Sequence, residues 1–416
     1  MFLRKKVVFA VALATSLGLV SFGMISPDVA TAERSTKRSP KAQASRAVKR
    51  SAVKAGSADA SSVGPACKST LLIDAASGQV LQETNSQEPL PPASMVKMMT
   101  TYSTLKKVRE GSVKLEDMIT ASPWASKIGG SQVYLKQGEQ FSLNQLLEAV
   151  LVQSANDAAT AIAEHLGGSV DGFVEVMNRD AQALGMSQSE FHTPHGLPPG
   201  KDQKPDLVSA RDFGLLARAL LREFPEVTNY TSLQTKEFRG GAFQMSNHNH
   251  LLRHFPGADG MKTGYYREAG FCVTATAARN GTRMIAVVMG CEQRKERDKQ
   301  ASELLAKGFS QFTSVRLIEK GAKIQQVVPV ANGAQASVSL ATTQDVFASL
   351  KSGDEKRVVQ KPTGCQRLTA PVKQNTPCGS ISFMLDEREV AKADLVVGVD
   401  VPEASTMGKM KQLFNL

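Results

Sequence analysis

The sequence feature that most constrains the fold is a hairpin signal near residue 280. Asn280-Gly281 separates two extended runs rich in apolar and β-branched residues, Gly270–Ala278 and Thr282–Gly290. Asn-Gly between such runs is a strong indication of a two-residue β-hairpin, because both turn positions take a positive φ. A third extended run, Gly257–Gly264, comes just before them. The sequence therefore predicts an antiparallel sheet in this part of the chain.

Helical patterns fill most of the chain before these strands. Residues 69–82 first predict a short hairpin around Gly78, and apolar residues then recur at helical spacings between Gly, Pro and capping Ser residues. The expected helices are Ala93–Arg109, Leu143–Gln153, Asp157–Leu166, Val170–Leu184 and a segment from Ser209 to Glu223. Helices between two groups of strands predict an α+β domain over residues 67–314, in which a helical region packs on an antiparallel sheet.

The C-terminal part of the chain has a different pattern. In residues 315–403, short apolar runs alternate with Gly and Pro turns, which predicts a small all-β domain. Residues 404–416 place Met407, Met410, Leu413 and Phe414 on one face of a short amphipathic tail. Such a tail is either a frayed or packed terminus or a weak contact with a membrane surface.

The net charge comes mostly from the N-terminal region. The chain of 416 residues carries a formal charge of +11, which alone would favour a polyanionic partner. Residues 1–60 hold eleven Lys and Arg against three Asp and Glu, a net of +8, and only +3 remains for the rest. We therefore expect no nucleic-acid surface on the folded body.

Residues 1–32 are typical of a secretory signal peptide. A basic start, the uncharged run Val7–Ile25 and an Ala30-Thr31-Ala32 end favour cleavage after Ala32, although an uncleaved anchor of this length stays open. Residues 33–66 are basic, rich in Ser and Ala, and too polar to form a core, so they predict a flexible linker, which could also bind anionic lipid or wall polymer. The body is expected in the periplasm or on the outer face of the cytoplasmic membrane.

Export to an oxidising compartment makes the five cysteines candidates for disulfides. Cys365 and Cys378 are close in the sequence and are the first expected pair. Cys272 and Cys291 flank the Asn-Gly turn and could pair across the hairpin, which would leave Cys67 over. The connectivity stays open at this point.

Three short motifs carry the chemistry. Ser94-Met95-Val96-Lys97 starts a predicted helix, and its spacing puts a hydroxyl and an amine on one face. Lysine accepts a proton near neutral pH only if burial or a second cation lowers its pKa, and the helix N-terminus favours a developing oxyanion. Ser154-Ala155-Asn156 lies at a helix junction, and Lys262-Thr263-Gly264 lies on the first late strand, where Gly264 leaves room for a substrate backbone.

Each motif alone is more often structural, but this ordered set is typical of penicillin-binding proteins and β-lactamases. The chain resembles the D-alanyl-D-alanine carboxypeptidases, the low-molecular-mass penicillin-binding proteins, over residues 68–313. The segments that carry the resemblance are Pro92–Thr100, Leu151–Ala159, Phe191–Leu197, Ser209–Asp212 and Asp259–Tyr265. The resemblance implies a serine β-lactamase/DD-peptidase-like fold followed by the family's all-β domain.

The same resemblance implies that the enzyme removes the terminal D-Ala from peptidoglycan stem pentapeptides without a cofactor. Ser94 would attack the carbonyl carbon, Lys97 would accept the proton, and Lys262 would lower the pKa of Lys97. Ser154 would relay a proton to the leaving D-Ala, and Asn156 would orient Lys97 and bind a substrate amide. β-Lactam antibiotics would bind covalently at Ser94.

Substrate binding involves further residues by the same resemblance. The N–H groups of Ser94 and Tyr265 would form the oxyanion hole. Thr263, beside Gly264, and Arg297 would bind the terminal carboxylate, although Arg294 is only three residues away. The family often has Asn-Arg-Asn where this chain has Asn247-His248-Asn249, and His is mostly neutral near pH 7.

Several alternatives stay open. A β-lactamase, a DD-endopeptidase that cleaves crosslinks, and a wall-binding or penicillin-sensing protein with little turnover would share these motifs. His248, His250 and His254 are close enough in sequence for zinc, but no HExxH or Cys partner accompanies them, so we expect no metal. His192 and His195 lie in a turn of the family and are expected to be structural.

Overall fold

The computed structural model describes residues 66–405. The predicted signal peptide, nearly all of the linker and residues 406–416 of the tail lie outside the described residues and stay predictions. Within residues 66–405, no helix is both long and apolar enough to cross a bilayer.

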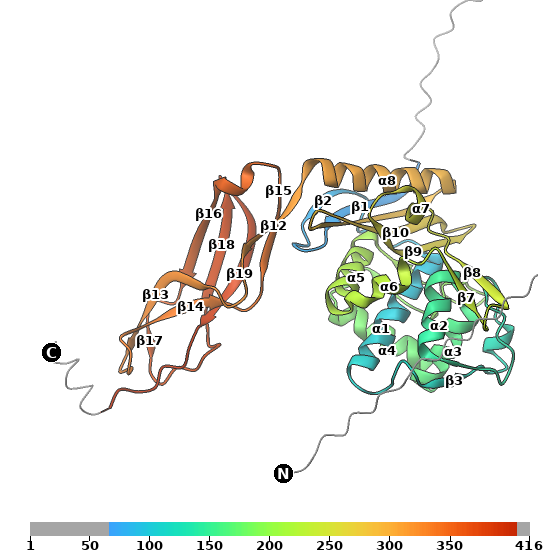
Figure 1. Ribbon diagram of the computed structural model, residues 1–416, viewed down its shortest axis with the longest axis horizontal. Coiled ribbons are helices and arrows are strands. Elements are labelled where there is room, and N and C mark those ends of the chain that lie inside the picture. The colour runs from blue at the N-terminus through green and yellow to red at the C-terminus, as the bar shows by residue number, and fades with distance from the viewer. Residues whose placement is uncertain (1–65, 406–416) are drawn as a thin grey trace, which may run out of the picture. The chain divides into compact units, whose positions relative to one another are not determined.

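A five-stranded antiparallel sheet, in the order β2-β1-β11-β10-β9, forms the centre of the first domain (Figure 1). Its strands are β1 Ser69–Asp74, β2 Val80–Thr84, β9 Ala258–Tyr266, β10 Gly270–Arg279 and β11 Thr282–Cys291. The predicted turn between β10 and β11 is confirmed, because Asn280 and Gly281 have φ values of 48° and 77°. The N-terminal hairpin joins this sheet because β1 pairs with β11, with Ser69 opposite Met289.

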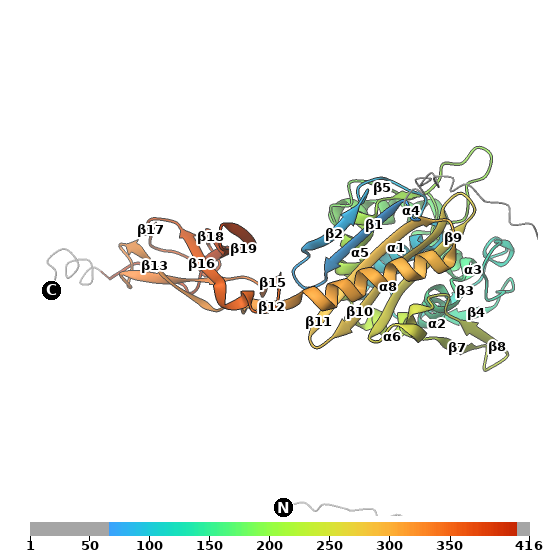
Figure 2. The ribbon, with the colours of Figure 1, turned by 90° about the horizontal axis from the view of Figure 1, so that it is seen from above.

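Helices cover both faces of the sheet. Helix α8 (Arg294–Gln311) packs on one face, and the larger helical region packs on the other (Figures 1 and 2). Strand alternation explains the two cores, since Leu71 and Ile73 face the helical region while Leu72 faces α8. The helices of that region are η1 Ala93–Val96, α1 Lys97–Arg109, η2 Ala125–Lys127, α2 Leu143–Glu148, η3 Ala149–Gln153, α3 Asn156–Gly167, α4 Val170–Ala183, α5 Ala210–Glu223, η4 Pro225–Val227 and α6 Thr228–Thr231. The short helix α7 (Leu251–His254) places Leu251 in the core beneath α8.

The helical segments predicted from the sequence are confirmed, with two differences. Residues 93–96 form the 3-10 turn η1 before α1, and the second difference lies at residues 143–153. The predicted single helix is α2 followed by the π-helical turn η3. The wider turn ends at Ser154, which takes the left-handed conformation with a φ of 62°. A π-turn and a left-handed serine break the helical register at the second motif, a deviation common at functional sites.

Short hairpins complete the first domain. They pair β3 Met118–Thr120 with β4 Gln140–Ser142, β5 Ser189–Glu190 with β6 Leu207–Val208, and β7 Thr235–Phe238 with β8 Phe243–Ser246. The β7–β8 hairpin leads directly into Asn247 and His248.

The C-terminal part is all-β apart from the short η5 turn (Asp354–Arg357), which confirms the predicted class. Its strands are β12 Thr313–Ile318, β13 Lys323–Ala331, β14 Ser337–Thr342, β15 Val346–Leu350, β16 Val358–Gly364, β17 Leu368–Thr369, β18 Pro377–Leu385 and β19 Arg388–Val397. They form a six-stranded sheet, β16-β18-β19-β14-β13-β17, and the pair β12-β15. Alternate side chains such as Leu340, Ile381, Phe383 and Leu395 form its core.

The disulfides confirm one predicted pair and contradict the other. Cys365 bonds to Cys378 as expected. Cys291, however, bonds to Cys67, and Cys272 is a free, buried thiol. The reason is strand geometry: Cys272 belongs to the core on the helical face, whereas Cys291 belongs to the core beneath α8. Continuing the β1–β11 register by two residues puts Cys67 opposite Cys291.

The connectivity gives a first prediction. A proteolytic digest made without reductant should contain a peptide that joins Cys67 to Cys291, identified by its mass. Cys67→Ser should lower the free energy of unfolding by about 2 to 5 kcal/mol, because the bridge closes a long loop in the unfolded chain. A peptide that joins Cys272 to Cys291 would contradict the structure.

Candidate active site

The nucleophile candidate Ser94 lies in the turn η1, which leads directly into α1 and Lys97. The side chains around them, Met95, Val96, Met98 and Met99, are buried and anchor this segment in the core. Lys97 Nζ lies 3.0 Å from Ser94 Oγ. The predicted hydroxyl–amine pair is therefore assembled by local helical geometry.

Lys97 has two further partners, and both are hydrogen-bond acceptors. Its Nζ lies 2.6 Å from Asn156 Oδ1 and 2.7 Å from the carbonyl oxygen of His195. A neutral amine has two N–H donors and one lone pair. If the two donors go to these acceptors, the lone pair faces Ser94 Oγ. The arrangement thus matches a neutral lysine that can take the Ser94 proton.

Asn156 starts helix α3 and is oriented from its other side. Its Nδ2 donates to the carbonyl of Gly129 at 2.7 Å, which directs Oδ1 toward Lys97. Gly130 makes this approach possible: its φ is +79°, and a Cβ there would lie 2.6 Å from Asn156 Nδ2. The loop before Ser131 is thereby part of the site, although no sequence motif marked it.

The carbonyl of His195 is held in place by a buried aspartate. Asp206 accepts hydrogen bonds from the N–H groups of His192 and Thr193, at 2.6 and 2.9 Å, and from Thr193 Oγ1 at 2.7 Å. Gly196, the next residue in this turn, packs so closely that a Cβ would lie 2.0 Å from the Ala93 carbonyl.

Burial raises the pKa of Asp206 and lowers the pKa of His195 to about 3, so the His195 ring is neutral. Sequence reasoning missed Asp206, which no local pattern connects to this turn.

Burial is the main reason why the pKa of Lys97 is low. The side chain has no exposed surface, and desolvation lowers its pKa well below the ordinary value of 10.5. The nearby cation of Lys262 lowers it further, while the carboxylates of Asp157 and Asp206 oppose the shift. The sequence predicted that burial or a second cation would lower the pKa of Lys97. Both act here, and burial has the larger effect.

Lys262 is itself buried on strand β9, where its Nζ donates to the Thr263 carbonyl at 3.0 Å. Burial, followed by the charge of Arg297, lowers its pKa to about 7. Gly264 has a structural role that the sequence did not indicate. A Cβ at Gly264 would lie 2.4 Å from the Pro92 carbonyl, so the glycine lets β9 lie against the nucleophile segment.

A pocket of about 520 Å³ opens above this buried network. Six of the residues predicted for the site line it, namely Ser94, Ser154, Thr263, Gly264, Tyr265 and Arg297. Ser131, Ser246, Asn247, His248, His250, Arg253, Phe271 and Arg294 line it as well. Lys97, Asn156 and Lys262 lie almost fully buried. The structure thus brings all nine predicted site residues together.

One wall of the pocket is cationic. Arg297 is only 3% exposed, and its Nε and Nη2 donate to Asp298 Oδ1 at 2.8 and 2.6 Å. Arg294 and Arg253 line the pocket nearby. Burial, together with the charges of Lys262 and Arg297, lowers the pKa of His248 to about 4, so this side chain is neutral at pH 7.

Residues 66–405 contain no cluster of three or more His, Cys, Asp or Glu side chains with the arrangement of a metal site.

These features are those of a serine acyl-transfer enzyme in which a buried lysine lies beside the nucleophile candidate. Comparison with known proteins supports this class of enzyme. Residues 56–293 match the family model for D-alanyl-D-alanine carboxypeptidase, and residues 312–403 match that for the penicillin-binding protein 5 C-terminal domain.

Individual relatives cover most of the chain. D-alanyl-D-alanine carboxypeptidase DacF of Bacillus subtilis is 32% identical over 349 residues, which are 83% of this chain and 88% of the relative. Penicillin-binding protein 5 of Haemophilus influenzae is 32% identical with a TM-score of 0.75, over 83% of this chain and all of that one. Penicillin-binding protein D2 of Listeria monocytogenes, solved in the ampicillin-bound form, is 30% identical with a TM-score of 0.54, over 59% of this chain and 98% of that one.

The chain belongs to the D-alanyl-D-alanine carboxypeptidase family. It is a serine-type D-Ala-D-Ala carboxypeptidase, and therefore a hydrolase, with an α+β catalytic fold followed by an all-β domain.

The role of Asp206 can be tested through pH. Asp206→Asn removes a negative charge that raises the pKa of Lys97. The acid limb of serine acylation should therefore move to lower pH, and the rate constant should fall about tenfold as the His195 turn loosens. The measurement is the pH dependence of covalent labelling by a fluorescent penicillin.

A matched control is Asp212→Asn. Asp212 is also buried and accepts hydrogen bonds from a backbone N–H and a hydroxyl, but Lys97 does not depend on it. The acid limb of labelling in Asp212→Asn should match that of the wild type. An acid limb that moves to higher pH in Asp206→Asn would contradict the assigned electrostatics.

Proposed function

We propose that Ser94 is the nucleophile that removes the terminal D-Ala from peptidoglycan stem pentapeptides. The contact between Ser94 Oγ and an amine with no exposed surface is the observation that carries this proposal. Ser94 Oγ attacks the carbonyl carbon of the penultimate D-Ala while Lys97 takes the hydroxyl proton. The C–N bond then breaks, and the leaving amine receives a proton through Ser154. Water hydrolyses the ester and restores Ser94.

The substrate carboxylate is expected at the cationic wall. Arg297 is almost fully buried and fixed by Asp298, and the Thr263 hydroxyl belongs to the same pocket. A pre-oriented guanidinium binds a carboxylate in two hydrogen bonds with little loss of side-chain freedom. The N–H groups of Ser94 and Tyr265 are assigned to the oxyanion that forms during attack. Asn156 orients Lys97 and is the expected partner of a substrate amide.

β-Lactams are proposed as covalent ligands of the same serine. The ampicillin-bound structure of the Listeria relative supports this, as does the ordered set of three motifs, which is typical of penicillin-binding proteins. Ser94 would open the lactam ring to give an ester, and the antibiotic carboxylate would occupy the place of the peptide carboxylate.

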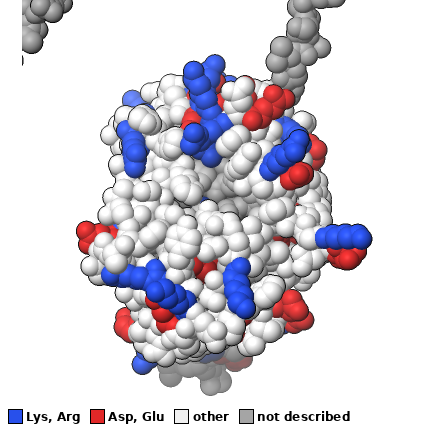
Figure 3. Space-filling view, turned by 90° about the vertical axis from the view of Figure 1, so that its right-hand side faces the viewer, with Lys and Arg blue, Asp and Glu red and all other residues white. Residues whose placement is uncertain are grey.

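Localisation and surface partners are also proposals. The signal-like residues 1–32 support export to the periplasm or the outer face of the cytoplasmic membrane, where wall peptides are available. Weak membrane-surface contact through the linker or tail is consistent with their composition. The described body has mixed charges: on the face in Figure 3, Lys and Arg lie among Asp and Glu around a largely uncharged centre. A surface of mixed charge does not favour a nucleic-acid partner, which would need a basic patch.

Ser94→Ala tests the nucleophile. The variant should release no D-Ala from a pentapeptide and should not be labelled by a fluorescent penicillin, because no ester can form. Product masses after incubation with pentapeptide and with crosslinked muropeptides separate carboxypeptidase from endopeptidase action. Unchanged D-Ala release by Ser94→Ala would refute the mechanism.

Arg297→Gln tests the carboxylate site. We expect kcat/KM for a peptide that ends in a free D-Ala carboxylate to fall about 100-fold, since a buried charge-assisted contact is lost. An analogue with a terminal amide should be affected much less. Arg294→Gln is the control for the neighbouring arginine, and a larger loss in that variant would reassign the site to Arg294.

A further inference from the structure

Tyr134 has an unusual conformation in a loop that leads to the pocket. It is 64% exposed and has a φ of 58°, a conformation that a bulky residue adopts only when its surroundings hold it there. Ser131, three residues earlier in the same loop, lines the pocket, and its carbonyl accepts from the Asn156 N–H at 2.7 Å. An exposed aromatic ring is thus fixed on a loop that continues into the active site.

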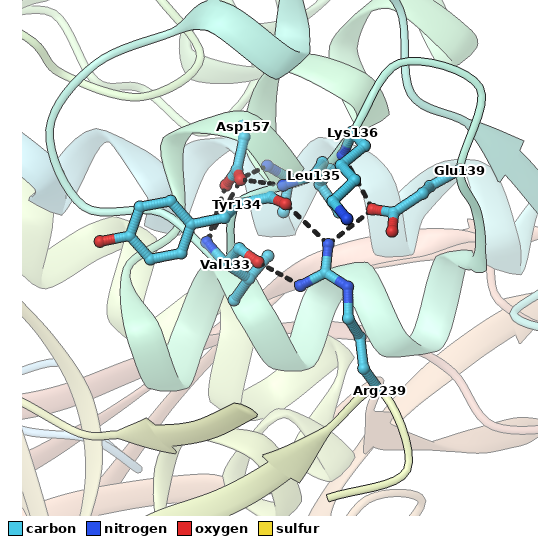
Figure 4. Close-up of polar contacts among 8 residues, drawn as sticks. Val133, Tyr134, Leu135, Lys136, Glu139, Asp157 and Arg239 are labelled. Carbon is cyan, nitrogen blue, oxygen red and sulfur yellow. Dashed lines mark hydrogen bonds and ion pairs between the residues drawn. The ribbon is translucent and has the colours of Figure 1, made fainter. Parts of the chain in front are cut away.

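The inner side of this loop is held by Asp157, the residue after Asn156. Its carboxylate accepts hydrogen bonds from the N–H groups of Val133 and Leu135, with shortest distances of 3.2 and 2.9 Å (Figure 4). The backbone on both sides of Tyr134 is therefore tied to the start of helix α3.

The outer side is held by Arg239, in the turn between β7 and β8. Its guanidinium donates to the carbonyls of Val133 and Tyr134, the latter at 2.8 Å, and pairs with Glu139 at 2.6 Å. The Arg239 hydrogen bond lowers the pKa of Glu139, which favours its anion. In Figure 4, Arg239 and Asp157 meet the loop backbone while the Tyr134 ring points away from the guanidinium.

A second aromatic ring supports the first. Phe243, on strand β8, meets Tyr134 edge to face with ring centroids 5.9 Å apart. Strand β8 ends at Ser246, which lines the pocket and whose N–H donates to Gln153 Oε1 at 3.0 Å. Both ring-bearing segments therefore continue into the pocket lining, one at Ser131 and the other at Ser246.

The charge of the pocket decides which part of a substrate meets these rings. The cationic residues that line it, Arg253, Arg294 and Arg297, lie in or beside α7 and α8, so the anionic end of a peptide binds there. Ser131 and Ser246 contribute an uncharged wall. The acyl part of the peptide, on the other side of the scissile bond, is left for this wall and the rings beyond it.

We infer that Tyr134 and Phe243 form an aromatic rim that packs against the aliphatic side chain of the residue before the two D-Ala. Arg239 is a positioning residue for this rim, because it fixes the backbone that carries Tyr134. This inference rests on the proposed function and adds a determinant of substrate side-chain specificity. Aromatic rings with few rotatable bonds provide such contact area at low entropic cost.

The test compares two peptides, diacetyl-L-Lys-D-Ala-D-Ala and acetyl-Gly-D-Ala-D-Ala. For Tyr134→Ala, the ratio of kcat/KM for the lysine peptide to kcat/KM for the glycine peptide should fall about tenfold. The fall should come mainly from a higher KM for the lysine peptide, because apolar contact with its side chain is lost. Arg239→Ala should lower the same ratio, whereas Tyr134→Phe should keep it. Trp124→Ala is the control, since Trp124 is an exposed aromatic (62%) on a segment, residues 122–127, that contributes no residue to the pocket, and the ratio should not change.

Other outcomes overturn the inference. An equal loss for both peptides in Tyr134→Ala and Arg239→Ala would show that these residues only support the fold, and an unchanged ratio would show that the rim does not contact the substrate. Thermal unfolding of each variant separates misfolding from altered specificity. If the wild-type enzyme releases D-Ala from neither peptide, the proposed function fails instead.

Discussion

The site depends on one constraint, the complete burial of the Lys97 amine. A charged amine without water would cost several kcal/mol, so the fold favours the neutral form. In the neutral form, the carbonyl oxygens of Asn156 and His195 can accept the two N–H donors, which leaves the lone pair for Ser94. The surroundings thus give an ordinary lysine the properties that a base needs.

This constraint explains why distant parts of the chain must meet. The amide of Asn156 depends on the loop at Gly129, and the carbonyl of His195 depends on Asp206. Gly196 and Gly264 let their segments approach the backbone of residues 92–94, where any side chain would clash. The sheet and the helical region therefore act together as a rigid support for three short motifs.

Local patterns were enough to predict much of this protein from its sequence. The Asn280-Gly281 hairpin, the helical segments and the three motifs depend on neighbouring residues, and the structure agrees with them. Long-range pairing could not be predicted in the same way. The bond between Cys67 and Cys291 requires the β1–β11 register, which no local pattern reveals.

The supporting residues of the site were missed for a related reason. Asp206 acts on a turn thirteen residues away, and Arg239 acts on a loop about a hundred residues away. The π-turn before Ser154 has the same apolar pattern as a normal helix, so periodicity could not distinguish them. Side chains that act by holding another segment's backbone have no sequence signature of their own.

The most direct test of the account is a titration of Lys97 itself. Lysine labelled with ¹³C at Cε reports its protonation by NMR, and the Lys97 signal can be assigned from its loss in Lys97→Met. The account predicts a titration midpoint well below the ordinary value of 10.5, and a higher midpoint than in the wild type when Lys262 is replaced by Ala. A midpoint near 10.5 in the wild-type protein would contradict it.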